Sequence, residues 1–346
     1  MSSEELVVNL HAKEPSWSWL SHRTPPDRFY WKSYSERPQS AVERLITRPQ
    51  LSRYRAVFSG VAAARRENAV LIVTHGPQLA AATRALCRTT GLRIPHLAVA
   101  FTMTRLPGPM GRAYMTRAIR GIDRFVCFSS IERARYAEVF DIPTDKIDIL
   151  RWSVAEPDYD VAAPALIEGD YICAVGGEGR DVPTLFAAMK ELSDLKLVLV
   201  TRPANIAGLE VPTNVDVRTN IPLEEVWNIT HNARLHVLPL VSSDVPAGHG
   251  TLIMAMQLST PSVVTRSEAM IDYVDGEETA LECEPQDPSS LGSQVRRLWD
   301  DQDLAERITS AGRRFAIEEC SEDRTYAYFH TYLKQRGLIS DTDAVA

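Results

Sequence analysis

The stretch 239–264 (PLVSSDVPAGHGTLIMAMQLSTPSVV) carries residues suited to binding phosphate. An apolar run ends, a polar loop follows, and Gly248, His249, Gly250 and Thr251 open an apolar stretch of helical spacing. Glycines at a helix start let a ligand approach the backbone, and the unpaired N–H groups there attract phosphate oxygens. The pattern predicts a diphosphate site, although the same glycines would also suit a tight strand-to-helix turn.

The stretch 171–185 (YICAVGGEGRDVPTL) is the second one with useful chemistry, because an apolar run there enters a glycine-rich loop. The loop delivers Arg180 beside Asp181, just before a predicted helix. A guanidinium can donate two hydrogen bonds to a phosphate and stays charged while a leaving group becomes negative. We predict that Gly176, Gly177 and Arg180 bind the phosphates and that Arg180 is catalytic. The alternative is an Arg180–Asp181 surface pair or a helix cap.

Two residues in the first half of the chain are further candidates for the site. His75 stands at the end of the apolar run LIVTH, where its imidazole would line the edge of a sheet. We predict a catalytic role for it, although a histidine at a strand end is more often structural. Arg105, in the segment TRLPGP, is a candidate acceptor contact on position alone.

The segment 111–122 (GRAYMTRAIRGI) has the pattern of a basic amphipathic helix. Such a helix in an acidic protein could touch anionic lipid or an anionic acceptor. The alternative, which we favour, is that its apolar arc packs on the sheet while the arginines are solvated. At helical spacing the apolar arc holds Tyr114, Met115, Ala118, Ile119 and Ile122, and the opposite arc holds Arg112, Arg117 and Arg120.

Short apolar runs alternate with longer stretches of helical spacing along the chain, which is the pattern of β-α units on a parallel sheet. In the first half the expected strands are 6–10, 69–74, 96–100, 124–128 and 146–150, and the expected helices are about 40–67, 77–90, 110–121 and 130–139. In the second half the expected strands are 171–175, 195–200, 215–217, 235–240, 261–265 and 279–283, with helices beginning near Val182, Pro222, Gly250 and Pro288.

This alternation predicts an α/β protein with two doubly wound, Rossmann-like domains. Residues 155–168 carry prolines and acids with little periodicity, so we predict a linker there, between an N-terminal domain over 1–154 and a second domain over 169–322. Two such domains would place their ligand loops around a central cleft, which is the expected active site.

The composition argues against several other classes of protein. The chain has 38 Lys+Arg against 45 Asp+Glu, a net charge of −7, which disfavours general nucleic-acid binding. No apolar run approaches the roughly 18 residues that cross a bilayer, and the polar start MSSEELVVNL is unlike a signal peptide, so we expect a cytoplasmic protein. The five cysteines are widely spaced, which indicates neither a disulfide framework nor a zinc site.

The order of motifs over residues 169–320 resembles the donor-binding domain of GT-B-fold glycosyltransferases, most closely the retaining family 4 (glycosyl transferases group 1). The motifs are VGGEGRDVPTL, LKLVLV, IPLEEVWNITHNARLHVLPL, GHGTLIMAMQLSTPSVVT and MIDYVDGEETALECEPQDPSSL. The first half, with VLIVTHGP and HLAVAFTMTRLP, looks more loosely like the acceptor-side domain. The resemblance implies that 323–346 form a helix returning to the N-terminal domain and a short polar tail.

The resemblance also implies a reaction. The donor would be a nucleotide-diphosphate sugar, a UDP- or GDP-sugar, and the acceptor a hydroxyl of a carbohydrate, a glycolipid or a small molecule, with no cofactor and no metal ion. Thr102 stands where family members often carry a histidine, so it is a candidate acceptor contact. Three Asp-x-Asp triplets lie in the linker, in a helical segment and in the tail, and we interpret them as chance in an acidic chain.

The chain departs from the family pattern at the donor site. Two glutamates eight positions apart flank the glycine loop in the family, and here the aligned positions hold Pro246 and Met254, the latter at the ribose-binding position. Methionine cannot accept a ribose hydrogen bond as a carboxylate does. Asp244 is the nearest acid and would replace the first glutamate if the loop has shifted. Gly177 falls where the family has an arginine and Arg180 near its lysine, so one cation remains.

Hypotheses from two classes follow. The leading one is a sugar transferase that uses a nucleotide-diphosphate sugar. The alternative is a catalytically degenerate GT-B protein that acts as partner or regulator of an active transferase, since both glutamates and one cation are missing. A sugar-nucleotide epimerase or hydrolase stays open because a fold does not fix function. A weak peripheral membrane contact and a homo-oligomer also stay open.

Overall fold

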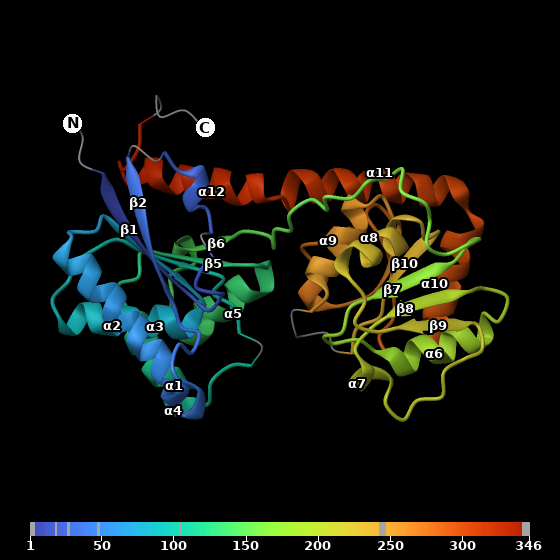
Figure 1. Ribbon diagram of the computed structural model, residues 1–346, viewed down its shortest axis with the longest axis horizontal. Coiled ribbons are helices and arrows are strands. Elements are labelled where there is room, and N and C mark those ends of the chain that lie inside the picture. The colour runs from blue at the N-terminus through green and yellow to red at the C-terminus, as the bar shows by residue number, and fades with distance from the viewer. Residues whose placement is uncertain are drawn as a thin grey trace. The chain divides into compact units, whose positions relative to one another are not determined.

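The computed structural model describes residues 4–17, 19–25, 28–46, 49–103, 105–241 and 247–340. The chain divides into two compact units, the first made of residues 1–150 and 326–346 and the second of residues 151–325. Each unit has a six-stranded parallel sheet with helices packed against it (Figure 1). The predicted α/β class with two Rossmann-like domains is confirmed.

In the first unit the order of strands reverses between β1 and β3, and a ligand crevice is expected beyond the carboxyl ends of strands at such a point. The strand order is β2 (Phe29–Ser35), β1 (Glu5–His11), β3 (Leu71–His75), β4 (His96–Val99), β5 (Arg124–Cys127) and β6 (Ile147–Ile149). The helices are α1 (Ala41–Leu45), α2 (Leu51–Arg66), α3 (Pro77–Thr89), α4 (Pro109–Ile119) and α5 (Ser130–Phe140).

In the second unit the reversal lies between β7 and β10. The strand order is β12 (Leu281–Cys283), β11 (Ser262–Thr265), β10 (Leu235–Leu238), β7 (Ile172–Val175), β8 (Leu197–Val200) and β9 (Val215–Arg218). The helices are α6 (Val182–Glu191), α7 (Pro203–Ile206), α8 (Leu223–His231), α9 (His249–Gln257), α10 (Pro288–Asp300) and α11 (Gln302–Glu319), and α12 (Glu322–Gln335) follows. None of the helices in the described ranges has the length and apolar character to cross a bilayer.

Two elements of the first unit differ from the prediction. The strand β2 was not predicted, because it is an edge strand with only Phe29 and Ser35 buried, so its apolar pattern is weak. The helix expected over 40–67 is two helices, since α1 ends at Leu45 and α2 begins at Leu51. Pro49 lies between them, and a proline disfavours helical backbone in the residue before it.

The second unit begins at Arg151, a few residues before the predicted end of the N-terminal domain at Val154. The segment 151–154 is held by hydrogen bonds to other residues of the second unit. These are Arg151 Nε to the Asp272 carbonyl (2.7 Å), the Trp152 N–H to the Tyr273 hydroxyl (2.8 Å), and the Val154 N–H to the Cys320 carbonyl (3.0 Å).

The segment 155–168, predicted as a linker, is also part of the second unit. Ile167 is buried there, and the side-chain amide of Asn228 donates to the Tyr159 hydroxyl at 2.9 Å. Near the C-terminus the chain joins the first unit at Tyr326, within α12, rather than at the predicted residue 323. A hydrogen bond from the Tyr328 hydroxyl to Asp148 Oδ2 (2.7 Å) holds α12 to β6.

Two buried histidines are uncharged in the fold. His96 and His236 are 1% and 0% exposed, and burial lowers the pKa of each to about 3. His96 Nε2 lies 2.9 Å from Thr74 Oγ1, and His236 Nδ1 lies 3.2 Å from Ser262 Oγ. Their other ring nitrogens are buried and have no hydrogen-bond partner among the described residues, so a second proton on either ring would be unpaired.

We therefore expect acid to destabilise the protein at unusually mild pH. Below the ordinary histidine pKa of 6.5, the imidazole of the unfolded chain binds a proton, whereas the buried ring of the folded protein binds one only near pH 3. The free energy of unfolding therefore falls as the pH falls from 6.5 to about 3. Each ring contributes a slope of about 1.4 kcal/mol per pH unit. Urea unfolding at several pH values should show a shallower slope for His96→Gln. The exposed-site variant His22→Gln should keep the wild-type slope, and equal slopes for both variants would contradict the assignment.

Candidate functional site

The two stretches predicted to bind phosphate meet at the carboxyl edge of the second sheet. The loop after β7 and the segment after β10 are joined by two backbone hydrogen bonds, from the Asp181 N–H to the Pro239 carbonyl (3.1 Å) and from the Val241 N–H to the Gly179 carbonyl (3.0 Å). This is the point at which the strand order reverses. The fold thus brings Arg180 and the start of α9 together at the position where open α/β sheets bind ligands.

Arg180 links the glycine-rich loop to α9. Its Nη2 donates to Thr251 Oγ1 (2.9 Å), its Nη1 to the Glu178 carbonyl (2.7 Å), and its Nε and Nη2 to the Val175 carbonyl (3.3 Å each). Burial lowers the pKa of Arg180 to about 10, against the opposing effect of Glu178, so the group stays charged at neutral pH. Nη1 has a second N–H for which no acceptor lies among the described residues.

The alternative of an Arg180–Asp181 surface pair is not what the fold contains. Asp181 is buried and caps α6, since its Oδ1 accepts from the Thr184 N–H (3.1 Å) and its Oδ2 from the Thr184 hydroxyl (2.7 Å). Arg180 points instead to backbone carbonyls and Thr251. The helix cap is therefore Asp181, and the guanidinium beside it has a separate role.

Gly176 and Gly177 leave room for two arginine side chains. Gly176 has a φ of +107°, and a Cβ there would overlap the Arg180 guanidinium. A Cβ on Gly177 would lie 2.7 Å from Cγ of Arg202, which also forms an ion pair with Glu178. Arg202 is thus a second cation at this loop, and it was not predicted. Its position just after β8 could have identified it, because the carboxyl ends of parallel strands lie at the same edge of the sheet.

The start of α9 matches the predicted strand-to-helix turn. Gly248 precedes the helix with a φ of +85°, and a Cβ there would lie 3.0 Å from Cδ2 of Leu238. The His249 side chain is only 7% exposed, and its Nε2 lies 2.8 Å from the Ala269 carbonyl, so the ring is engaged within the protein. Gly250 and Thr251 complete the first turn, whose backbone N–H groups have no partner inside the helix.

Of the residues at or near the positions of the family glutamates, only Met254 lies in the described part of the chain. Met254 is 9% exposed and packs in an apolar cluster with Val175, Val200 and Leu258. Its thioether therefore belongs to the core of the second unit. Asp244, predicted to bind the donor, lies outside the described residues, and Pro246 does as well.

His75 lies at the reversal of the first sheet, in a group of aromatic rings. Its Nε2 is 2.9 Å from Asn9 Oδ1, and the amide of Asn9 donates to Ser33 Oγ at 3.2 Å, which fixes the orientation of the amide. The rings of Trp17 and Trp19 pack edge-on at 4.8 and 4.9 Å. Burial lowers the pKa of His75 to about 3, so its ring is neutral and is suited to hydrogen bonding rather than to general-base work.

The two candidate acceptor contacts are in different surroundings. The Thr102 hydroxyl donates to Glu132, a 6% exposed carboxylate that also accepts from the Tyr136 hydroxyl (2.9 Å) and the Phe128 N–H (3.0 Å). Burial and the adjacent Glu132 raise the pKa of Tyr136, so the tyrosine hydroxyl keeps its proton. Arg105 is exposed. No hydrogen bond brings it together with Thr102 in the part of the chain that the structure describes.

Comparison with known proteins gives a match to one family model. Residues 172–301, most of the second unit, match the family model described as Glycosyl transferases group 1. No curated protein sequence matches the chain.

Solved structures resemble the chain over nearly its whole length. One is sucrose-phosphate synthase from Thermosynechococcus elongatus, with 15% sequence identity, coverage of 97% of this chain and 100% of that chain, and a TM-score of 0.71. Another is HepE from Anabaena in complex with UDP-glucose, with 10% sequence identity, coverage of 95% of this chain and 99% of that chain, and a TM-score of 0.68. A glycosyltransferase from Rickettsia africae is similar as well, with 12% sequence identity, coverage of 98% of this chain and 100% of that chain, and a TM-score of 0.68. At such identities the likeness shows the fold, which is the GT-B fold of glycosyltransferases. The match to the glycosyl transferases group 1 model covers residues 172–301, which is less than half of the chain.

Proposed function

We propose that the protein is a glycosyltransferase that moves a sugar from a nucleotide-diphosphate sugar to an acceptor hydroxyl, with retention and without a metal ion. The observation that carries the proposal is the 2.9 Å bond from Arg180 to Thr251, which fastens a charged guanidinium to the first turn of α9 at the reversal of the sheet. Solved complexes support the class of donor, since HepE is described with UDP-glucose and with UDP.

In this proposal the chain supplies electrostatic stabilisation of the leaving group. The first-turn N–H groups of Gly250 and Thr251 donate to diphosphate oxygens, and the second N–H on Nη1 of Arg180 donates to the same group. As the bond between the sugar and the diphosphate breaks, negative charge builds on the diphosphate, and these donors stabilise it. Arg202 adds a second positive charge at the glycine-rich loop.

Several predicted roles stay predictions within this proposal. They are the donor contacts of Gly176, Gly177, Gly248, His249, Asp244 and Met254, the acceptor contacts of Thr102 and Arg105, the catalytic role of His75, and the central cleft between the domains. For His75 we propose a neutral hydrogen-bonding role, since its pKa is about 3. The retaining outcome rests on the resemblance to family 4.

Binding of nucleotides to the intact protein tests the proposal. Calorimetry with UDP, GDP and other nucleoside diphosphates should give a Kd between about 1 μM and 1 mM for at least one of them. The matching nucleoside monophosphate should bind about tenfold more weakly, because it lacks the second phosphate that the α9 amides would hold. If a folded sample binds no nucleoside diphosphate, the proposal fails.

The matching nucleotide sugar then tests the reaction. With an acceptor panel, transfer should continue in EDTA, and NMR of the product should show the donor's anomeric configuration. Donor consumption without any acceptor would favour a hydrolase or an epimerase. Binding without any turnover would favour the degenerate partner protein.

A further inference from the structure

One region of the first unit is strongly basic although the chain as a whole is acidic. Residues 68–122 contain no Asp, Glu or Lys, whereas the whole chain has a net charge of −7. Because no carboxylate lies within this stretch to neutralise it, its positive charge is concentrated on α3, α4 and the loops beside them. The seven arginines of the stretch are Arg84, Arg88, Arg93, Arg105, Arg112, Arg117 and Arg120.

The helix α4 also exposes apolar side chains. Met115, Ala118, Ile119 and Ile122 are buried, as the amphipathic pattern predicts. Tyr114 was predicted on the same arc and is instead 59% exposed, because it lies at the edge of the arc beyond the packed residues. Met110, in the first turn, is 89% exposed. Met110 and Tyr114 thus add exposed apolar groups to a helix that also carries arginines.

The same helix and its C-terminal cap carry three arginines. Arg112, Arg117 and Arg120 line a hollow of about 530 Å³ together with Pro109, Ala113, Thr116 and Val139. No guanidinium of the three has a hydrogen bond or an ion pair with a described residue. Arginine binds phosphate with paired donors and is weakly hydrated, so such a hollow suits phosphate head groups.

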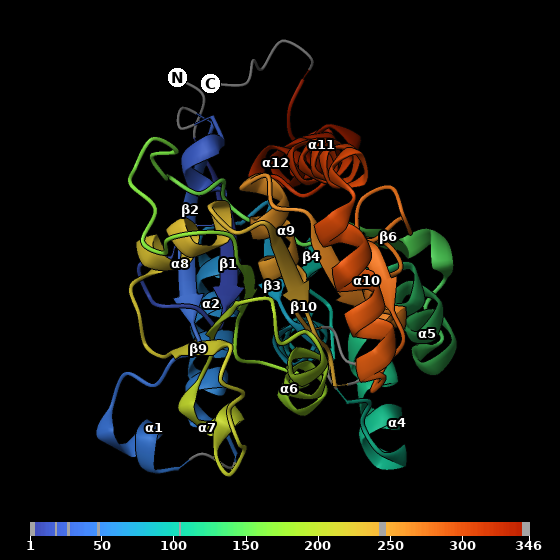
Figure 2. The ribbon, with the colours of Figure 1, turned by 90° about the vertical axis from the view of Figure 1, so that its right-hand side faces the viewer.

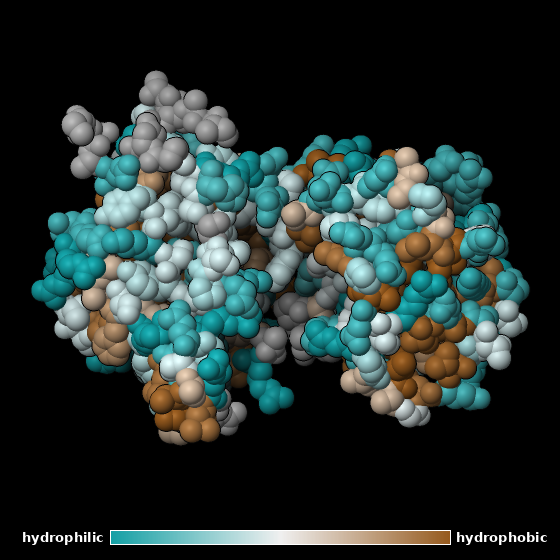
Figure 3. Space-filling model, in the orientation of Figure 1, coloured by the Kyte–Doolittle hydropathy of each residue, from teal (hydrophilic) through white to brown (hydrophobic). Residues whose placement is uncertain are grey.

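A second apolar tip lies at the same end of the first unit. In both Figure 1 and Figure 2, α1 and α4 project at the lower end of the unit, and Figure 2 separates them laterally. Leu45 on α1 is 84% exposed and Val42 is 58% exposed. Figure 3 shows a hydrophobic patch at this end. The two helices thus offer two apolar contacts on one side of the unit.

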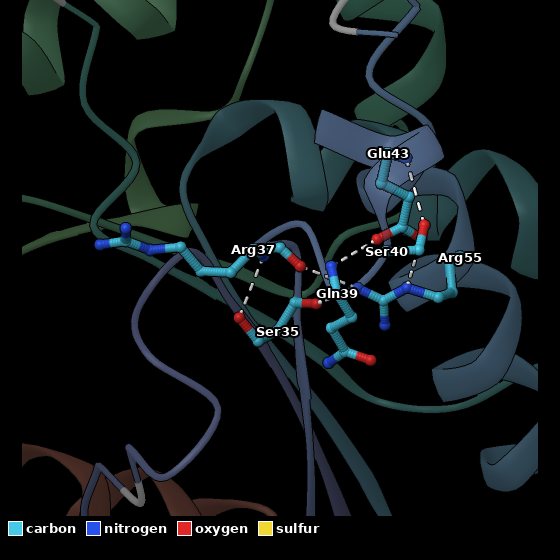
Figure 4. A network of polar contacts seen from close by, with 6 residues as sticks. All are labelled: Ser35, Arg37, Gln39, Ser40, Glu43 and Arg55. Atoms are coloured by element: carbon cyan, nitrogen blue, oxygen red, sulfur yellow. Dashed lines mark hydrogen bonds and ion pairs between the residues drawn. The ribbon is translucent and has the colours of Figure 1, made fainter. Parts of the chain in front are cut away.

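The tip formed by α1 is held firmly to the unit (Figure 4). Glu43 accepts from Arg55 Nε on α2 and from the Gln39 N–H, both at 2.7 Å, and Ser40 Oγ accepts from the Glu43 N–H at 3.2 Å. Arg55 also donates to the Arg37 carbonyl at 2.9 Å. These bonds present Leu45 from a fixed helix.

We propose that this α1–α4 end, defined by Leu45, Met110, Arg112, Tyr114, Arg117 and Arg120, docks on the surface of an anionic lipid bilayer. The arginines would contact lipid phosphates, and Met110 and Leu45 would enter the interface. A soluble polyanion would be bound by the arginines alone and leaves the exposed apolar side chains unexplained. A lipid surface uses both features, and it extends far enough to meet both helices.

Flotation with vesicles tests the charge. The wild-type protein should bind vesicles of phosphatidylcholine with phosphatidylglycerol, and should bind pure phosphatidylcholine vesicles much less. Each arginine contributes about fivefold to binding at an anionic surface, so Arg112→Gln/Arg117→Gln/Arg120→Gln should lose about 100-fold. The matched control is Lys196→Gln/Arg307→Gln/Arg314→Gln, which removes the same charge from exposed side chains of the second unit and should keep wild-type binding.

A site-specific fluorophore tests the insertion. All five native cysteines are buried, so a single exposed cysteine can be labelled selectively. An environment-sensitive dye on Met110→Cys or Leu45→Cys should shift to the blue with phosphatidylglycerol vesicles. The same dye on Val161→Cys, at a 69% exposed site of the second unit, should not shift.

Three results would overturn the proposal. The first is equal binding of the wild-type protein to both kinds of vesicle, and the second is an equal loss of vesicle binding in the two triple variants. The third is the absence of a blue shift for the dye on Met110→Cys and on Leu45→Cys. Heparin binding without vesicle binding would identify a polyanion site instead. These assays need no nucleotide, so their outcome is separate from that of the proposed transferase. Unchanged urea unfolding of each variant shows that its fold is intact.

Discussion

Arg180→Ala is expected to lower the rate of sugar transfer by about 10²-fold or more. The substitution removes the charge that we propose faces the leaving diphosphate, together with the 2.9 Å bond that fastens the glycine-rich loop to Thr251. Electrostatic stabilisation acts on the charge that develops during bond breaking, so kcat should fall more than KM rises. Steady-state kinetics with the nucleotide sugar identified by calorimetry measures both constants.

Two further variants separate the charge of Arg180 from its geometry. Arg180→Lys keeps a cation but cannot reproduce the bonds to Thr251 and to two carbonyls, so we expect an intermediate loss. Arg234→Ala is the matched control, because Arg234 lies in the same unit just before β10 and pairs with Asp170, at the opposite edge of the sheet. It should keep wild-type kcat.

Urea unfolding must accompany these kinetics. Removal of the guanidinium leaves the Val175 and Glu178 carbonyls with fewer donors, which costs about 1 to 3 kcal/mol of stability. Rates are therefore compared at temperatures where every variant is folded. If folded Arg180→Ala transfers sugar at the wild-type rate, Arg180 does not act on the leaving group. If it also leaves the cellular role unchanged, the degenerate partner protein becomes the better hypothesis.

Gly176→Ala is expected to lower the rate of sugar transfer by a similar factor, although it removes no charge. A Cβ at this position would overlap the Arg180 guanidinium. The Arg180 side chain must therefore give up its hydrogen bonds to the Val175 carbonyl and to Thr251. The φ of +107° adds backbone strain of about 1 to 3 kcal/mol. We therefore expect lower kcat and lower stability, measured by the same kinetics and urea unfolding.

A matched glycine and a double variant isolate the displacement of Arg180. Gly208 has a φ of +77°, and a Cβ added there would have nothing within 4 Å, so Gly208→Ala adds backbone strain without a collision and should keep wild-type kcat. Gly176→Ala/Arg180→Ala should be about as slow as Arg180→Ala alone, since residues that act through one interaction are not additive. Effects on kcat that multiply would show that Gly176 acts independently of Arg180.

The sequence predicted those parts of the site that depend on local pattern. The helix start at Gly248 and His249 is where glycines and a following apolar stretch indicate it, and the loop 176–180 lies directly after a strand. Both features are properties of neighbouring residues. The edge strand β2 was missed for the same reason, because a strand with few buried side chains has little apolar pattern to read.

The sequence by itself determined the alternation of strands and helices, the glycine-rich turns and the order of motifs that resembles the GT-B transferases, since each of these is written in adjacent residues. Only the tertiary structure decided which turns meet. The reversal of strand order between β7 and β10 brings Arg180 to Thr251, and the pairing of β7 with β8 brings Arg202 to Gly177. Strand order is fixed by packing between segments far apart in the chain. Tyr114 is exposed in the first unit and Met254 is buried in the second, because the burial of a side chain depends on the neighbours that the fold places against it.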